Sequence, residues 1–263
     1  MPQDGQIGAT EAPVSSETIE TLLNRVSVRK FSDRPVPEET VEAILRASFR
    51  APTSSNIQSY SVVVVTDPEI RKAIYPITGN QKHILTAPVF LAFCADLTRI
   101  EAATRINGHD IGDNNLEIGL VSSIDASLVG MSAYLAADSL GLKGVMIGAV
   151  RNDAVATARA LGLPHRVYCV FGMCLGYPDE SPAQKPRMDY TTLVHYERYG
   201  GLRDNRDMEQ ALNDYDTSLA AHYRGHGVTT TDDSWTHAMD ARFVPQVRDK
   251  LREQLKAQGF DFR

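Results

Sequence analysis

The chain has 263 residues, of which 43% are hydrophobic, so it is long enough to bury a substantial core in one large domain or two small ones. Its formal net charge is -6 and its lysines and arginines form no block, which argues against nucleic acid or an anionic membrane as the main partner. No apolar run approaches the roughly 20 residues that span a bilayer. The three cysteines lie in apolar runs, which is typical of reduced thiols in a cytoplasm. We therefore expect a cytoplasmic protein that acts on small molecules.

The amino-terminal part of the chain predicts a tail and two helices. Residues 1–16 lack a regular pattern, a basic start and an apolar centre, so we expect a disordered tail and no secretory signal. A serine cap signal followed by spaced apolar residues predicts a short helix from Ser16. A second helix is expected to begin at Pro37 and to end before Pro52, because a residue that precedes proline avoids the α region.

The middle of the chain predicts four strands and a long helix. Short β-branched or apolar runs predict the strands "SVVVV", "APVFLAFCAD", "GVMIG" and "RVYCVFGMCLGYP", while residues 100–115 look like a loop. Residues 116–140 predict a helix that glycine ends, and residues 152–162 predict another. Small residues on the long helix would let a second helix approach, which favours burial against a second subunit. We expect its inward face to consist of Ile118, Val121, Ile124, Leu128, Met131 and Leu135.

The carboxyl-terminal part changes character. Two amphipathic patterns, over residues 207–223 and 241–257, predict helices beyond the last strand. We therefore expect a core over residues 17–200 and a helical excursion over residues 201–263 that packs on a partner subunit.

Common catalytic signatures are absent from the sequence. It contains no GxGxxG after a strand, no GxxxxGK[ST], no GxSxG and no CxxC pair. His222 and His226 stand at helical i, i+4 spacing, but no carboxylate lies in an HExxH arrangement with them. Exposed histidines are the simpler interpretation, and we expect no metal.

A scattered set of cations could carry the chemistry. Arg25, Ser27 and Arg29 alternate, so in an extended segment their side chains point the same way. Lys185 and Arg187 flank a proline that stiffens the loop after the fourth strand. These groups could converge on a dianionic phosphate. The alternative, which spacing alone favours, is an exposed edge strand and an ordinary surface loop.

A polar loop precedes the first strand. Thr53, Ser54 and Ser55 offer hydrogen bonds with little bulk, so a flat polar ring could come close to the backbone. The alternative is a connection built of turn residues, which is the commoner role of such a loop.

These segments together resemble the FMN-dependent nitroreductase family, whose members open with "RRSxRxF" and then "APSSxNxQ". Here the matching stretches are "RVSVRKF" and "APTSSNIQ", and the similarity continues through "TGNQKHILTAPVFLAFCADL", "GLKGVMIGAVRND", "VFGMCLGYP" and "KPRMDYTTLVHYERY". The similarity covers about residues 20–258. Over this extent the chain is similar to the A-type oxygen-insensitive NADPH nitroreductases and to the flavin reductase of luminous bacteria. The resemblance implies an α+β fold, with a mostly antiparallel sheet flanked by helices, and an intertwined homodimer with two FMN sites at the interface.

The resemblance also implies the residues of the site. His83 lies where relatives often contact substrate, Arg224 is the nearest match to an arginine that meets NADPH, and no catalytic side chain beyond the flavin is required. The backbone N–H groups of residues 146–149 would lie beside the flavin ring, and Lys185 and Arg187 would meet its phosphate. The full implied cofactor set is Arg25, Val26, Ser27, Val28, Arg29, Thr53, Ser54, Ser55, Gln81, Met146, Ile147, Gly148, Ala149, Lys185 and Arg187.

The expected activity is hydride transfer from NAD(P)H to FMN, followed by reduction of nitroaromatics, quinones or related acceptors in a ping-pong cycle. Alternatives are an NAD(P)H:flavin oxidoreductase that supplies reduced flavin to a partner, and a flavin-binding redox sensor with little turnover. The family's arginine cluster for the 2'-phosphate of NADPH is replaced here by "TTTDD" at residues 229–233. Because carboxylates repel a phosphate and accept a bond from a 2'-hydroxyl, NADH becomes a candidate reductant beside NADPH.

Overall fold

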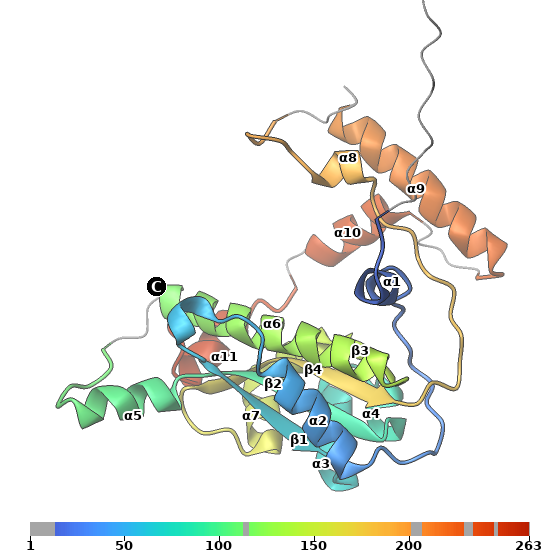
Figure 1. Cartoon of the computed structure of the whole chain (residues 1–263). Helices are drawn as coiled ribbons and strands as arrows, with labels where there is room; N and C mark the ends of the chain where they lie inside the picture. Colours follow the sequence, from blue (N-terminus) through green and yellow to red (C-terminus); the bar gives the residue numbers. More distant parts are fainter. Residues whose placement is uncertain (1–13, 113–115, 201–206, 229–233, 245–246, 263) are drawn as a thin grey trace, which may run out of the picture.

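A computed structural model describes residues 14–112, 116–200, 207–228, 234–244 and 247–262. Its centre is a four-stranded sheet in the order β1-β2-β4-β3, and every neighbouring pair is antiparallel. The strands are β1 (Tyr60–Val65), β2 (Val89–Asp96), β3 (Lys143–Ile147) and β4 (Val167–Gly176). These are the four runs that the sequence predicted, and the α+β class is confirmed (Figure 1). The intertwined homodimer stays a prediction.

Eleven α-helices and two 3₁₀ segments occur within the described residues. The helices are α1 (Glu17–Leu23), α2 (Glu38–Ser48), α3 (Pro68–Ile77), α4 (His83–Thr86), α5 (Thr98–Ile106), α6 (Leu116–Ser139), α7 (Ala154–Leu161), α8 (Tyr190–Leu193), α9 (Met208–Gly225), α10 (Trp235–Phe243) and α11 (Leu251–Ala257), and the 3₁₀ segments are η1 (Ser54–Asn56) and η2 (Gly148–Asp153).

Local sequence signals account for several helix ends. The side chain of Ser16 accepts a bond from the Ile19 N–H at the start of α1, as its cap signal predicted. Asp67 caps α3 in the same way, and the proline after it occupies the first turn. Gly162 ends α7 in the left-handed conformation that glycine adopts without strain.

The sheet separates two apolar layers. Helices α2 and α6 cover one face, where Leu91, Phe93 and Tyr134 are buried together. Helices α3, α4 and α7 cover the other face, around Ile84 and Phe90. Every residue of β2 is buried, because this strand has a neighbour on each side and a helical layer on each face.

The described structure corrects two local predictions and shows one irregularity in the sheet. Residues 98–106 form helix α5 where the sequence indicated a loop. The helix predicted over residues 241–257 is two helices, and Val244 is extended between them, as expected of a residue before proline. In a regular strand Cys169 and Cys174, which are five residues apart, would point to opposite faces; both lie in the same buried cluster because the pairing of β2 with β4 shifts by one residue between them.

Helix α6 shows the opposite face inward from the one predicted. Its small residues, including Ala126, Gly130 and Ala133, are buried against the sheet, whereas Ile124 is 55% exposed and Leu128 39% exposed. The ring of Phe171 occupies the space where a Cβ at position 130 would lie. Because the helix is apolar on all sides, it is long and apolar enough to cross a membrane, which the sequence analysis did not expect of any segment. Within the chain, 44% of its most apolar 18-residue stretch is buried.

The last third of the chain leaves the core and returns to it. Helices α8, α9 and α10 lie on an arm that extends away from the sheet (Figure 1). Helix α11 packs back on the same chain, where Leu255 and Phe260 are buried beside Tyr168. Helix α11 is thus part of the core of its own chain, and the packing of residues 201–263 on a partner subunit stays a prediction.

Candidate functional site

The segment Arg25–Arg29 runs beside the edge strand β3. It is extended without being part of the sheet, and its one ladder-like bond joins the Val28 N–H to the Gly144 carbonyl at 3.1 Å. Arg25 Nη1 lies 3.4 Å from Ser27 Oγ, so these two side chains share a face, as their alternation predicted. The hydroxyl of Tyr134, on α6, donates to the Val26 carbonyl at 2.7 Å and fixes the segment against the core.

The loop after β4 folds onto this segment. The Gln184 side chain donates to the carbonyls of Leu23 at 2.6 Å and Arg25 at 3.0 Å. Glu180 Oε1 accepts the backbone N–H of Arg29 at 2.6 Å. The structure thus brings the "KPR" loop next to "RVSVR", although more than 150 residues separate them in the sequence.

Helix α9 supplies a further contact to the "KPR" loop that the sequence analysis missed. Lys185 Nζ donates to Tyr223 Oη at 2.8 Å and lies 5.0 Å from the centre of that ring. Tyr215 Oη, two turns earlier on the helix, donates to the Pro186 carbonyl at 3.2 Å. Arg187 donates only to the carbonyls of Lys185 and Pro186. Aromatic residues in a predicted amphipathic helix gave no signal for this role.

Four cations of this region have no carboxylate partner. None of the ion pairs within the described residues includes Arg25, Arg29, Lys185 or Arg187. Charged donors that bond only to neutral oxygens keep most of their capacity for an anionic ligand. The arrangement therefore suits the phosphate and the electron-rich edge of a flavin nucleotide, and we name Arg25, Ser27, Arg29, Lys185 and Arg187 the anion cluster.

His83 lies at the border of the anion cluster. It is 8% exposed, and its Nε2 atom is buried with no hydrogen-bond partner in the described structure. Burial lowers the pKa of His83 below its ordinary value, and the nearby charge of Arg29 lowers it further, while Glu180 acts in the opposite direction. The lowered pKa makes the imidazole neutral at pH 7.

The remaining predicted cofactor residues of the core lie around the end of β3. Met146 is half-exposed, Ile147 is buried, and Gly148 and Ala149 open the segment η2. Asn152, in η2, donates to the Ile77 carbonyl at 3.2 Å and so joins this segment to α3, four residues before Gln81. Gln81 itself donates to the Thr78 carbonyl at 2.8 Å, which fixes the turn that leads to His83.

An arginine near the carboxyl terminus also reaches the end of β3. Arg248 donates to Asn152 Oδ1 at 3.0 Å and approaches the Gly148 carbonyl at 3.5 Å. Burial, with the charges of Arg151 and Arg242 nearby, lowers its pKa. Sequence reasoning had assigned position 248 to an amphipathic helix and missed this contact.

The polar loop does not join the anion cluster within one chain. The Ser54 N–H donates to Asp125 Oδ1 at 3.1 Å, so Thr53, Ser54 and Ser55 are anchored on α6 at Asp125. The Arg25–Arg29 segment is anchored on the same helix at Tyr134. Nine residues make about two and a half turns and about 13.5 Å, so the two anchors project from opposite sides of α6.

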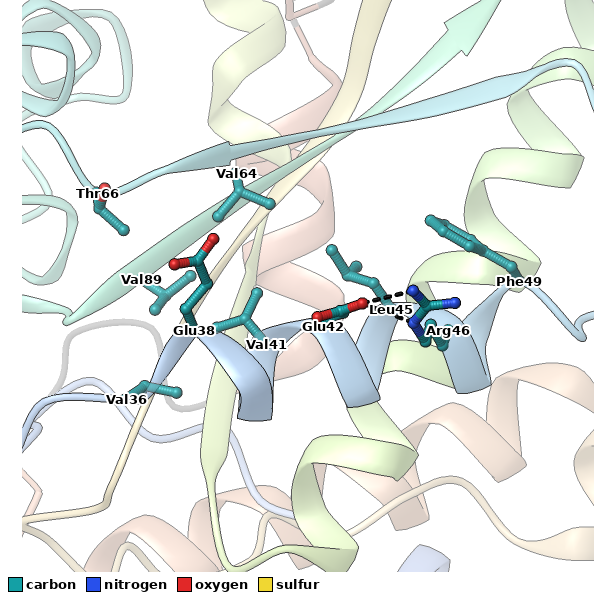
Figure 2. A pocket seen from close by; sticks show the side chains of 10 residues that line it. All are labelled: Val36, Glu38, Val41, Glu42, Leu45, Arg46, Phe49, Val64, Thr66 and Val89. Carbon is teal, nitrogen blue, oxygen red and sulfur yellow. Dashed lines mark hydrogen bonds and ion pairs between the residues drawn. The ribbon is translucent and has the colours of Figure 1, made fainter.

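A hollow of the described structure lies away from these residues. Figure 2 shows it between α2 and β1, lined by Val41, Leu45, Phe49 and Val64 with the ion pair of Glu42 and Arg46 at its rim. Its volume is about 690 Å³, and none of the predicted site residues lines it. We place the candidate site at the anion cluster because the chemistry of the side chains, rather than the size of the hollow, points to a ligand there.

The residues expected to meet the reductant are only partly described. Arg224 is exposed in the last turn of α9, one residue after Tyr223. Residues 229–233, which carry the departure from the family pattern, lie outside the described residues. The rings of His222 and His226 are 4.6 Å apart, and the described part of the chain contains no group of three residues that could hold a metal ion.

Two family models match most of the chain. The model of the "Nitroreductase family" matches residues 22–177, and that of the "Nitroreductase family, C-terminal domain" matches residues 185–263. The first match begins just before the Arg25–Arg29 segment and ends after β4, and the second begins at Lys185.

Individual relatives match over nearly their full lengths. An oxygen-insensitive NADPH nitroreductase of Salmonella typhimurium is 35% identical over 93% of this chain and 98% of its own length. An FMN reductase (NADPH) of Bacillus subtilis is 31% identical over 94% of this chain and 99% of its own. The structure of an NADPH:FMN oxidoreductase from Vibrio harveyi in complex with NAD+ superposes with a TM-score of 0.83 at 33% identity, and covers 94% of this chain and 100% of its own.

Proposed function

The chain belongs to the nitroreductase family, and from this premise we propose that it is an FMN-dependent enzyme that uses NADPH or NADH to reduce nitroaromatics, quinones or related small acceptors. Membership of this family makes the protein an oxidoreductase of the NAD(P)H-dependent nitroreductase and flavin reductase type.

The observation that carries the proposal is the anion cluster, in which four cations have no carboxylate partner among the described residues. Lys185 and Arg187 would hold the phosphate, because they lie on a loop stiffened by proline and their charged groups bond only to neutral oxygens. Arg25, Ser27 and Arg29 would hold the flavin end, with residues 146–149 along the ring.

The side chains of the site position and stabilise rather than react. FMN, when bound, supplies the redox chemistry by accepting a hydride from NAD(P)H and giving electrons to the acceptor afterwards. The guanidinium of Arg29 forms no ion pair within the described residues, although Glu180 accepts its backbone N–H, and it would supply positive charge to a reduced flavin held by the anion cluster. Neutral His83 can orient a polar atom of the acceptor without adding charge. No nucleophilic side chain is needed, which agrees with the absence of a triad motif.

A second copy of the chain would complete the site. The exposed side chains of Leu120, Ile124 and Leu128 recur every four residues and form an apolar stripe along α6. Exposed apolar stripes of this kind are typical of protein interfaces. Because the polar loop and the anion cluster lie on opposite sides of α6, we propose that the loop of one chain contacts the cofactor held by its partner's cluster.

A second candidate function is that of a flavin reductase, which would release reduced flavin to a partner enzyme. It is favoured by the relatives of that name, including the NADPH:FMN oxidoreductase of Vibrio harveyi. The two functions differ in whether FMN stays bound during turnover.

The test begins with the purified full-length protein. We expect a yellow protein with a flavin spectrum that oxidises NADPH or NADH when menadione or nitrofurazone is present. Retention of FMN through a desalting column after turnover supports the first function, and dependence of the rate on added free FMN supports the second. A colourless protein that cannot be reconstituted with FMN would overturn both.

A further inference from the structure

A buried carboxylate stands in the middle of the most apolar helix. Asp125 is 0% exposed, and it is the one charged residue between Glu117 and Asp138 on α6. A carboxylate that leaves water destabilises the fold unless several donors satisfy it. Its neighbours Ala126 and Val129 pack on the apolar core, so the packing of the helix does not require a charge here.

The bonds of Asp125 go to the two ends of the polar loop. Oδ1 accepts the Ser54 N–H at 3.1 Å, while Oδ2 accepts the N–H and the hydroxyl of Ser59, both at 3.2 Å. No cation pairs with it in the part of the chain that the structure describes. One carboxylate therefore closes a loop whose ends are five residues apart.

The backbone between these two anchors is strained. The φ angles of Ser55, Asn56 and Gln58 are +46°, +57° and +53°, and residues other than glycine seldom adopt positive values. Such conformations persist only where the surroundings impose them. Arg99 supplies a second restraint, since its guanidinium donates to the carbonyls of Gln58 and Tyr60.

The bond between Ser54 and Asp125 limits which groups of the loop can contact a ligand. Because Asp125 takes the Ser54 N–H, a ligand at the loop meets the exposed side chains of Ser54 and Ser55 rather than this amide. A loop freed from its carboxylate would relax toward ordinary backbone angles and turn these hydroxyls away.

We propose that Asp125 is a positioning residue, which holds the loop in the strained conformation that presents Ser54 and Ser55 to the flavin. This inference rests on the proposed function, because it concerns the same cofactor site. It assigns a role in cofactor binding to a residue that cannot itself touch the cofactor.

The experiment compares Asp125→Asn and Asp125→Ala with a matched control, Asp138→Asn. Asp138 is on the same helix, and its carboxylate accepts Lys143 Nζ at 2.6 Å without touching the loop. We measure FMN affinity by quenching of flavin fluorescence, the visible circular dichroism of bound FMN, and thermal stability without FMN. An asparagine whose amide oxygen accepts both bonds from Ser59 loses only the bond from Ser54 and should weaken FMN binding about tenfold, whereas alanine loses all three bonds and should weaken it about a thousandfold, since each lost charge-assisted bond is worth about one decade.

A merely structural role would predict a different pattern. Both Asp125→Asn and Asp138→Asn would then lower thermal stability, and neither would change FMN affinity or the circular dichroism of the flavin. That result would overturn the inference, as would unchanged affinity in Asp125→Ala. If the alanine variant fails to fold, Asp125→Asn together with Ser59→Ala, which removes only the hydroxyl donor, decides the question. Failure of the wild-type protein to bind FMN would refute the proposed function itself and is distinguished by the wild-type spectrum.

Discussion

Lys185 offers the sharpest test of the anion cluster. Its Nζ atom donates to Tyr223 Oη at 2.8 Å, and no carboxylate of the described chain pairs with it. If the cluster binds the phosphate of FMN, Lys185→Met removes one charge-assisted bond and keeps the length of the side chain. If the lysine is an ordinary surface residue, the same change has little effect.

The expected magnitude follows from the exposure of the side chain. Hydrogen bonds to charged groups contribute about 1.5–3 kcal/mol, and the exposed position of Lys185 favours the lower part of this range. We therefore expect the dissociation constant of FMN to rise about 10- to 30-fold, since 1.4 kcal/mol is about tenfold. The difference should shrink at high ionic strength, because salt screens exposed charges.

The assay is titration of the apoprotein with FMN, followed by flavin fluorescence at two salt concentrations. Tyr223→Phe should weaken binding about threefold, because it removes a single bond that orients the lysine. The double variant should match Lys185→Met, since the tyrosine acts only through the lysine. Lys72→Met is the control, because this exposed lysine pairs with Glu69 on α3. Equal affinity of Lys185→Met and the control would refute the assignment of the phosphate site.

Three further predictions concern pH, assembly and the reductant. Burial and the charge of Arg29 lower the pKa of His83 in the folded chain, so just below pH 6.5 the unfolded chain binds more protons than the folded one. The free energy of unfolding should therefore fall as the pH drops through that window. Urea unfolding of His83→Gln should show a smaller dependence of this free energy on pH. Ile124→Asp should convert the proposed dimer to monomers in sedimentation velocity, and a wild-type profile would count against the α6 interface. NADH should support a kcat/KM comparable to that for NADPH, and a large preference for NADPH would contradict the interpretation of residues 229–233.

The strands and most helix ends could be predicted because their signals are local. A short apolar run needs no partner to be recognised, and the run that forms β2 is buried at every residue. The cap residues Ser16 and Asp67 and the terminator Gly162 act within one helical turn of where they stand. Helix α5 was not predicted because glycines and polar residues follow Asn107 directly, although Glu101 and Arg105 have the i, i+4 spacing of a helical ion pair.

The face of α6 could not be predicted from periodicity. When a helix is apolar on all sides, spacing does not tell which stripe meets the sheet, and here the aromatic ring of Phe171 requires the glycine side. The buried carboxylate of Asp125 was the missed signal, since a single charge in twenty apolar and small positions must have donors. Those donors came from a loop more than sixty residues earlier, which no local pattern reveals.

The site itself depends on contacts that are distant in the sequence. The sequence predicted the approach of "RVSVR" to "KPR" only as one of two alternatives. The side chains of Gln184 and Glu180 bring the two segments together, and neither residue belongs to a recognisable motif. Side-chain bonds to backbone carbonyls and amides depend on where the chain passes, so residue type alone does not identify them.

The separation of the two half-sites links cofactor binding to assembly. Within one chain, α6 lies between the polar loop that Asp125 holds and the segment that Tyr134 holds. A ligand that touches both halves must bind two chains at once, and it then favours the dimer by the free energy of its second contact. FMN should therefore strengthen association, and dilution of the protein should weaken FMN binding. The exposed stripe of α6 and the strained loop beside it would thus belong to one coupled equilibrium rather than to an interface and a site that act separately.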